Sequence, residues 1–312
     1  MGRAGYSACM GWLDGRILRD LKHAGFAEAE RRAVRDTPAM WAQLSQFYAQ
    51  GGGVERVDAA FSGATGAPRH IRFFCPPPPA ACAHSTYGAL AHELGHALQC
   101  PAQWQPAVHF DSAQAYAHAR ELGEAHAWLN QYRLSRARLG GAPPAAQVLL
   151  IENDSDFGAT PVDIFARIAR REAAGWAEAQ ILAELAMLNA NMYPCGMGEG
   201  NLKTYGQCNR WDWLQATRAQ HPAFNDFLAR LPRPPHAGDQ KLLMKFNLFT
   251  GAHGVAASPE ALQALADGLA AVQRKDDLAA LYALACRTLP QSVPGVAVCA
   301  AGQPASAPPP AA

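Results

Sequence analysis

The chain has 312 residues, 49% of them hydrophobic, which is enough for one large domain or for a catalytic domain with a helical appendage. Its 27 basic and 26 acidic residues give a formal charge of +1, so no long-range field favours nucleic acid or an anionic membrane as a partner. No apolar stretch is long enough to cross a membrane, and the N-terminal residues lack the uninterrupted apolar core of a secretory signal.

The first 50 residues predict helices. Apolar residues recur at helical spacing through residues 11–50, with breaks near Gly25 and at Thr37-Pro38, and we expect two helices there. Three glycines at 51–53 end this pattern.

Two short strands are predicted next, over residues 54–61 and 70–75, because β-branched and aromatic residues dominate both stretches. The prolines at 76–79 end the second strand. An edge strand at this position could pair with the extended backbone of a peptide, or it could only support the core.

The helix that follows carries the sequence His-Glu-Leu-Gly-His at residues 92–96. Ser85 or Thr86 can cap its N-terminus, and Pro101 stops it. The pentapeptide therefore falls in the middle of the helix.

This HExxH sequence predicts a metal site. Residues four apart share one face of a helix, so His92 and His96 can both bind a single ion. Glu93 then lies beside the ion and can take a proton from a water bound to it. We expect one catalytic Zn2+ at this position, with Glu93 as the general base.

The second half of the chain predicts further helices. One is capped by Ser112 and runs to about Leu139, before Gly140-Gly141, and others lie near 162–190 and 210–231. The Gly-rich stretch 191–208 lacks the spacing of a phosphate-binding loop, so we interpret it as a loop.

Residues 259–273 and 275–288 predict a helical hairpin, and the Pro- and Ala-rich residues from 290 onward a disordered tail. These patterns divide the chain into an N-terminal helical segment, a catalytic region, a helical accessory region and a tail: 1–37, 38–140, 141–289 and 290–312.

The third metal ligand is less defined, because catalytic zinc uses three protein ligands. A metzincin would have histidine six residues after His96, where this chain has Ala102. Asp111 lacks the neighbouring residues of an aspzincin site. Glu121 and Glu124 lie on the next long helix and share a face, so their spacing leaves both open, with Asp111 or a histidine as a further alternative.

The sequence His92-Glu93-Leu94-Gly95-His96, followed after 27 residues by Glu124-Ala125, resembles the compact bacterial gluzincin-type metallopeptidases, including the ImmA/IrrE-like family. The resemblance covers residues 69–130 and departs at His126, where Asn or Asp is common. It implies Glu124 as the third zinc ligand. It also implies an α+β, predominantly α-helical fold, with a zincin-like core, a small sheet and a helical accessory region.

These patterns together predict a zinc-dependent peptidase that acts on a peptide or protein substrate. The first alternative is a non-catalytic, metal-stabilised sensor or interaction module, although such a module would not need Glu93. A second alternative is a protein whose helical second half carries the function, with an accidental HExxH sequence.

The eight cysteines include no CxxC pair. Disulfides such as Cys195 with Cys208 would suit their neighbourhoods, but a chain without a signal sequence normally stays in a reducing compartment. We therefore expect free thiols in a cytoplasmic protein, with export without a cleaved signal as the alternative.

Overall fold

The computed structural model describes residues 3–58, 63–65, 69–76, 82–99, 101–152, 159–195, 204–220 and 229. Within these ranges the fold is α+β and mostly helical, as predicted. None of the helices described is both long and apolar enough to cross a membrane. The predicted hairpin at 259–288 and the tail from 290 lie outside the described residues.

Residues 3–49 form three helices, where two were predicted: α1 (Arg3–His23), α2 (Glu28–Asp36) and α3 (Pro38–Ala49). Both predicted breaks end a helix. Gly25 adopts a left-handed φ of 88° just after α1, which disfavours a side chain with a Cβ. Pro38 is the first residue of α3, where its missing N–H costs nothing.

The first sheet contains β1 (Gly53–Val57), β2 (Gly63–Thr65) and β3 (His70–Phe74) in the order β1-β3-β2. β1 is parallel to β3 and β2 is antiparallel to it. The strands predicted at 54–61 and 70–75 correspond to β1 and β3. The sequence analysis missed β2, because a three-residue strand that starts with glycine has no alternating pattern. β2 is an edge strand.

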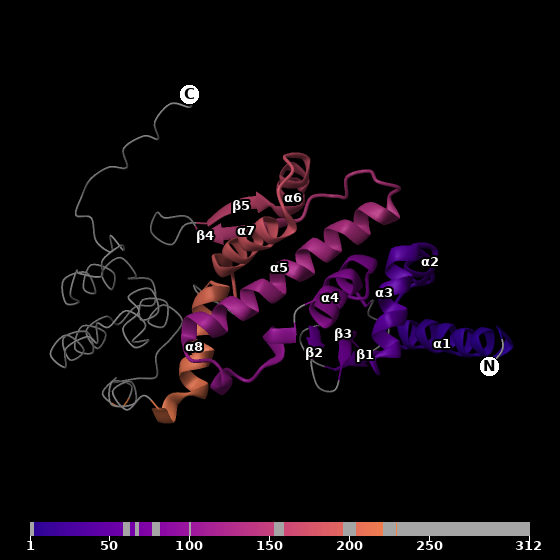
Figure 1. Ribbon diagram of the computed structural model, residues 1–312, viewed down its shortest axis with the longest axis horizontal. Helices are drawn as coiled ribbons and strands as arrows, with labels where there is room; N and C mark the ends of the chain where they lie inside the picture. The colour runs from indigo at the N-terminus through magenta and orange to yellow at the C-terminus, as the bar shows by residue number, and fades with distance from the viewer. Residues whose placement is uncertain are drawn as a thin grey trace.

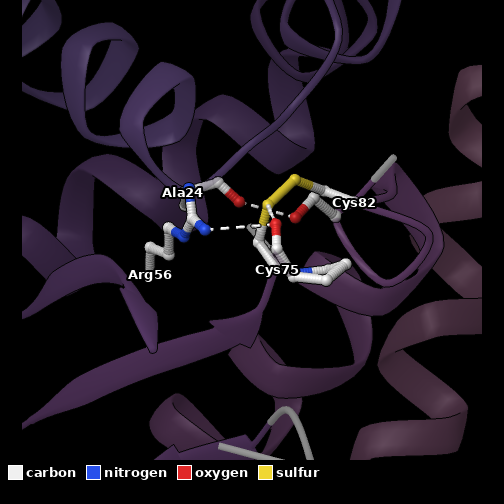
Figure 2. Close-up of a disulfide and its surroundings, with 6 residues drawn as sticks. Ala24, Arg56, Cys75 and Cys82 are labelled. Carbon is white, nitrogen blue, oxygen red and sulfur yellow. Dashed lines mark hydrogen bonds between the residues drawn. A yellow bond between two sulfur atoms is a disulfide. The ribbon is translucent and has the colours of Figure 1, made fainter. Parts of the chain in front are cut away.

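A disulfide between Cys75 and Cys82 joins the end of β3 to the segment before α4 (Figure 2). The Ser85 hydroxyl donates to the carbonyl oxygen of Ala24 at 2.6 Å, and Arg56 donates to the carbonyl of Pro76 at 3.1 Å. The expectation of free thiols is therefore wrong for this pair. The disulfide and these hydrogen bonds fix the start of α4 against the N-terminal helices.

Helix α4 (Tyr87–Gln99) carries the HExxH sequence. Its N-terminus is capped by Thr86, whose hydroxyl accepts from the backbone N–H of Ala89 at 3.2 Å. Leu90 and Leu94 are fully buried, so the apolar side of the helix faces the first core while the histidines face the opposite way.

Helix α5 (Ala113–Arg138) follows two short 3-10 helices, Pro101–Trp104 and Ala107–His109. The predicted cap at Ser112 is confirmed, since its side chain accepts from Ala115 N–H at 3.1 Å. α5 is the longest helix described and runs diagonally through the molecule, with α4 and the first sheet along one side (Figure 1).

The other side of α5 is covered by a second sheet and three helices (Figure 1). The strands pair antiparallel in the order β5-β4-β6. The elements are β4 (Val148–Glu152), β5 (Ala159–Asp163), α6 (Ile164–Ala173), α7 (Glu178–Ala190), β6 (Met192–Tyr193) and α8 (Tyr205–Ala216), followed by a 3-10 turn at Arg218–Gln220.

This second sheet adds strands to the accessory region, which was predicted to be helical. Residues 148–151 form a short apolar run, which periodicity alone cannot assign to a strand or to a buried helix, so the sequence did not reveal β4. A second disulfide, between Cys195 and Cys208, connects the segment after β6 to α8, which again contradicts the expectation of free thiols.

Two hydrophobic cores lie on either side of α5. The first is formed by α1, α2, α3, α4 and the first sheet, and it receives Leu134 from α5. The second is formed by α6, α7 and the second sheet, and it receives Ala125, Leu129 and Tyr132. α5 therefore belongs to both cores and sets the position of every residue along it relative to α4.

Candidate metal centre

Helices α4 and α5 pack closely at Gly95. A Cβ atom at this position would lie 2.5 Å from Cα of Ala127 and 3.0 Å from Cβ of Asn130. The absence of a side chain lets the two backbones approach, as small residues do at tight helix crossings. This approach brings the histidine face of α4 against the middle of α5.

His92 and His96 on α4 and Glu124 on α5 come together at this crossing. Their ligand atoms all lie within 4.8 Å of one another. Nε2 of His92 is 3.4 Å from Oε2 of Glu124, and Nε2 of His96 is 3.4 Å from Oε1. Two imidazoles and one carboxylate around a common point can hold a metal ion, and this donor set suits Zn2+ among other metals.

The Glu124 carboxylate is held in its charged form. Burial alone would raise its pKa, but the neighbouring His96 and His92 outweigh that effect and lower the pKa to about 2. The carboxylate is therefore ionised at neutral pH, as a metal ligand must be.

Gln103, in the first 3-10 helix, fixes the orientation of His96. Its Oε1 lies 2.8 Å from Nδ1 of His96, and its Nε2 donates to the backbone carbonyl of the same residue at 2.7 Å. Because Oε1 can only accept, Nδ1 carries the proton and the lone pair of Nε2 faces Glu124. Gln103 is only 4% exposed, and Gly123 on α5 leaves space for its amide, which a side chain there would displace.

His92 is positioned by an aromatic contact. The Trp128 ring on α5 packs against it at a centroid distance of 4.2 Å with an interplanar angle of 63°. Trp128 lies one helical turn after Glu124, so the same face of α5 provides both the carboxylate and the ring that restricts His92.

Glu93 is half-buried and lies beside the three candidate ligands. The pKa of Glu93 is raised to about 7, mainly by burial. The negative charge of Glu124 raises this pKa further. The positive charge of His96 and the hydrogen bond that the Ala64 N–H donates to the carboxylate lower it. A carboxyl group whose pKa lies near neutrality can both accept and release a proton. A divalent cation beside it would lower this pKa.

The alternative third ligands lie elsewhere. Glu121 is directed toward α8, where its Oε1 is 4.0 Å from Nη1 of Arg210 and close to Gly206. Asp111 is exposed and is not among the residues that the structure brings to the metal centre. Of these carboxylates, Glu124 is the one that lies with His92 and His96 in a group that could hold a metal ion, as the resemblance implied.

Other histidines and a tyrosine on or near α5 are not in the group of candidate ligands. His109 and His118 are exposed, and His126 lines a separate cavity of about 210 Å³ with Gln43 and Asn130. Tyr132 packs in the second core.

A cavity of about 400 Å³ opens onto the candidate ligands. Its wall combines β2, α4, α5, the first 3-10 helix, β6 and the start of α8. The described residues that line it are Gly63, Ala64, His92, Glu93, His96, Gln103, Trp104, Arg120, Glu124, Trp128, Met192 and Tyr205.

The sequence analysis missed Gln103, Arg120, Trp128 and Tyr205 as residues of the site. Arg120 and Trp128 lie four residues before and after Glu124, so helical spacing could have placed them on its face. Gln103 and Tyr205 reach the cavity through tertiary packing, for which the sequence carries no local signal.

No family model, curated protein or solved structure matches this chain.

Proposed function

We propose that this protein is a zinc-dependent metallopeptidase with a zincin-like core, which hydrolyses peptide bonds in a peptide or protein substrate. The observation that carries the proposal is the convergence of His92, His96 and Glu124 within 4.8 Å, with the carboxyl group of Glu93 buried beside them and facing the same cavity. A structural metal site needs ligands, but it needs neither an open cavity nor an adjacent base.

His92, His96 and Glu124 would hold the ion, and three protein ligands leave one position for water or substrate. Bound zinc supplies a lowered pKa for a coordinated water and polarises a carbonyl group. The remaining steps belong to the residues of the chain.

Glu93 acts as the general base and acid. Its carboxylate takes a proton from the attacking water, and the resulting carboxyl group then passes that proton to the nitrogen of the leaving amine. Tyr205 also lines the cavity, and its phenol is a candidate donor to the oxyanion that forms when the carbonyl is attacked.

Strand β2 offers a binding surface for the substrate backbone. It is the edge of the first sheet, and its residues Gly63 and Ala64 line the cavity. An extended peptide could pair with this edge and lie across the metal centre.

The proposal is tested with purified zinc-loaded protein and a mixed peptide library read by mass spectrometry. Glu93→Gln keeps the shape of the side chain and all three ligands, so we expect stoichiometric zinc with a loss of activity of about 100-fold to 10,000-fold. Glu124→Ala should lose zinc, whereas Glu121→Ala, which removes a buried acid from the same helix, should keep it.

Wild-type rates in Glu93→Gln would refute the mechanism. Stoichiometric zinc without cleavage of any peptide by the wild type would favour the non-catalytic module. Loss of zinc in Glu121→Ala but not in Glu124→Ala would show that the ligand set is wrong.

A further inference from the structure

Arg120 introduces a positive charge into the cavity of the metal centre. It lies one helical turn before Glu124 on the same face of α5, and its side chain lines the cavity together with the candidate ligands. The two residues are separated by about 6 Å along the helix axis. This distance corresponds to about two residues of an extended peptide.

The guanidinium group is held in place by Tyr116. Nε and Nη2 of Arg120 donate to the Tyr116 hydroxyl at 3.2 and 2.9 Å, and the guanidinium carbon lies 5.1 Å from the ring centroid. Tyr116 is only 6% exposed, so its hydroxyl is a fixed anchor. The side chain of Arg120 is thus oriented before any ligand arrives.

The hydrogen bonds to Tyr116 leave the outer edge of the guanidinium group available. Of its five N–H donors, two are directed at Tyr116, and the remaining three lie on Nη1 and Nη2. Nη1 and Nη2 can each donate one of these N–H groups to a different oxygen of the same carboxylate. Within the part of the chain that the structure describes, Arg120 forms no ion pair with an acidic side chain.

The balance of charge in the cavity favours an anion at this position. The described lining residues include two carboxylates, Glu93 and Glu124, whose charges would balance those of one divalent cation. Arg120 then adds a positive charge that no further carboxylate among the described lining residues neutralises. A substrate carboxylate would supply the missing negative charge.

We propose that Arg120 is a substrate-binding residue that selects peptides carrying a carboxylate within about two residues of the scissile bond. This inference rests on the proposed function and adds the substrate class to it. The carboxylate is either the C-terminus of the peptide or the side chain of Asp or Glu, and the guanidinium group binds both in the same way.

A purely structural role for Arg120 would be to neutralise Glu124, which lies one turn away and whose pKa it helps to lower. That role would affect zinc binding and would be the same for every substrate. A binding role would instead separate substrates that differ only in their carboxylate. The test therefore measures preference rather than activity alone.

The kinetic arm uses zinc-loaded full-length protein and two pairs of peptides. One pair differs only in a free C-terminal carboxylate against a carboxamide, and the other has Glu against Gln next to the scissile bond. We expect wild type to prefer the carboxylate in one pair by about tenfold to 100-fold, mainly through KM. Arg120→Met should abolish that preference, and Arg120→Lys, which keeps the charge but loses the planar fork, should retain part of it.

Arg136→Met is the matched control, because Arg136 is an exposed arginine of the same helix that pairs with Glu172 outside the cavity. It should leave the preference unchanged. Zinc content is measured for each variant, so that a loss of the metal is not mistaken for a loss of substrate binding.

A binding arm needs no catalysis. Dissociation constants of N-acetyl-dialanine and its carboxamide are measured by NMR titration, alongside N-acetyl-glutamate diamide and its glutamine counterpart. We expect wild type to bind the free acid of one pair at least tenfold more tightly than its amide, and Arg120→Met to lose this difference.

Equal binding of acids and amides by wild type, or an unchanged difference in Arg120→Met, would overturn the inference even if peptides are cleaved. Absence of any cleavage together with an Arg120-dependent preference for acids would instead overturn the proposed peptidase and leave the carboxylate site standing.

Discussion

Gln103 fixes the orientation of His96, one of the candidate metal ligands. It contacts both the ring and the backbone of His96, so the imidazole can neither rotate nor exchange its tautomer without breaking a buried hydrogen bond. Such partners of metal-bound histidines contribute to affinity because they fix the orientation of the ligand before the ion binds.

We predict that Gln103→Leu weakens zinc binding by about 10-fold to 100-fold, because Nδ1 of His96 loses its acceptor while the three ligands remain. The measurement is a competition titration against a chelator of known affinity. Gln105→Leu, which changes an exposed glutamine two residues away, is the control and should leave the affinity unchanged. Equal zinc affinities in wild type and Gln103→Leu would contradict the assigned role.

Individual site residues differ in how far the sequence could reveal them. The spacing of HExxH places His92, Glu93 and His96 on one turn of a helix, because this is a local property of α-helical geometry. Glu124 required the resemblance to a family, since helical spacing alone left Glu121 equally possible. Gln103 and Tyr205 could not be predicted, because their positions depend on how separate elements pack.

At the scale of elements, the crossing of α4 and α5 creates the site. The two histidines and the carboxylate belong to different helices, and only the close approach at Gly95 brings them within reach of one ion. The glycine inside HELGH therefore has a structural role that is separate from the chemistry of its neighbours.

Gly95→Ala should lower the free energy of unfolding by about 1–3 kcal/mol, because the new methyl group meets the backbone of Ala127 and the helices must separate. The same separation should weaken zinc binding. Gly15→Ala is a matched control: it is also a helical glycine, a Cβ added there would meet nothing within 4 Å, and alanine there should add about 0.5–1 kcal/mol. Urea denaturation measures the free energy of unfolding of both variants. A Gly95→Ala protein as stable as wild type would refute the tight crossing of α4 and α5.

Helices α6 and α7 are joined by a salt bridge that should make stability depend on pH. Glu184 on α7 accepts from Arg171 at 2.7 and 2.8 Å and from Arg167 at 2.8 Å. The hydrogen bonds from Arg171 are the largest cause of a lowered pKa at Glu184, with burial opposing them and Arg167 adding to them.

A pKa lowered by folding means that the folded state favours the charged form. The stabilisation is therefore complete above the ordinary carboxyl pKa of 4.5 and is lost as the pH falls below it toward the pKa of the folded state. Glu184→Gln should cost about 1–2 kcal/mol at pH 7 and nothing once the wild-type carboxylate is protonated. Urea denaturation between pH 7 and pH 3 tests this, with the exposed Asp36→Asn as the control; a difference independent of pH would refute it.

At the scale of the whole molecule, α5 connects two cores, and the sequence predicted the elements of the first core better than those of the second. The α+β class, α4 and α5 followed from helical periodicity and capping residues, which are local signals. The second sheet did not, because the apolar run of β4 is too short to distinguish a strand from a buried helix, and its pairing with β6 joins residues far apart in sequence. The boundary predicted at residue 140 lies just after α5, and this helix contributes residues to both cores.

The two disulfides support opposite sides of this architecture. Cys75–Cys82 fastens the first sheet to the start of α4, and Cys195–Cys208 fastens the segment after β6 to α8. Met192 and Tyr205, close in sequence to the second disulfide, line the metal cavity. Each bridge closes a short loop, which limits the conformations of the unfolded chain.

Breaking each bridge should therefore lower the free energy of unfolding by about 2–3 kcal/mol, because the unfolded chain regains the entropy of its loop. Denaturation with and without reductant measures the combined effect in wild type. The double variants Cys75→Ser/Cys82→Ser and Cys195→Ser/Cys208→Ser separate the contributions, and each should remove its share of the response to reductant. The second double variant should also lower zinc-dependent activity more than the first, since its bridge lies beside the cavity wall. A wild-type protein whose stability does not respond to reductant would contradict both pairings.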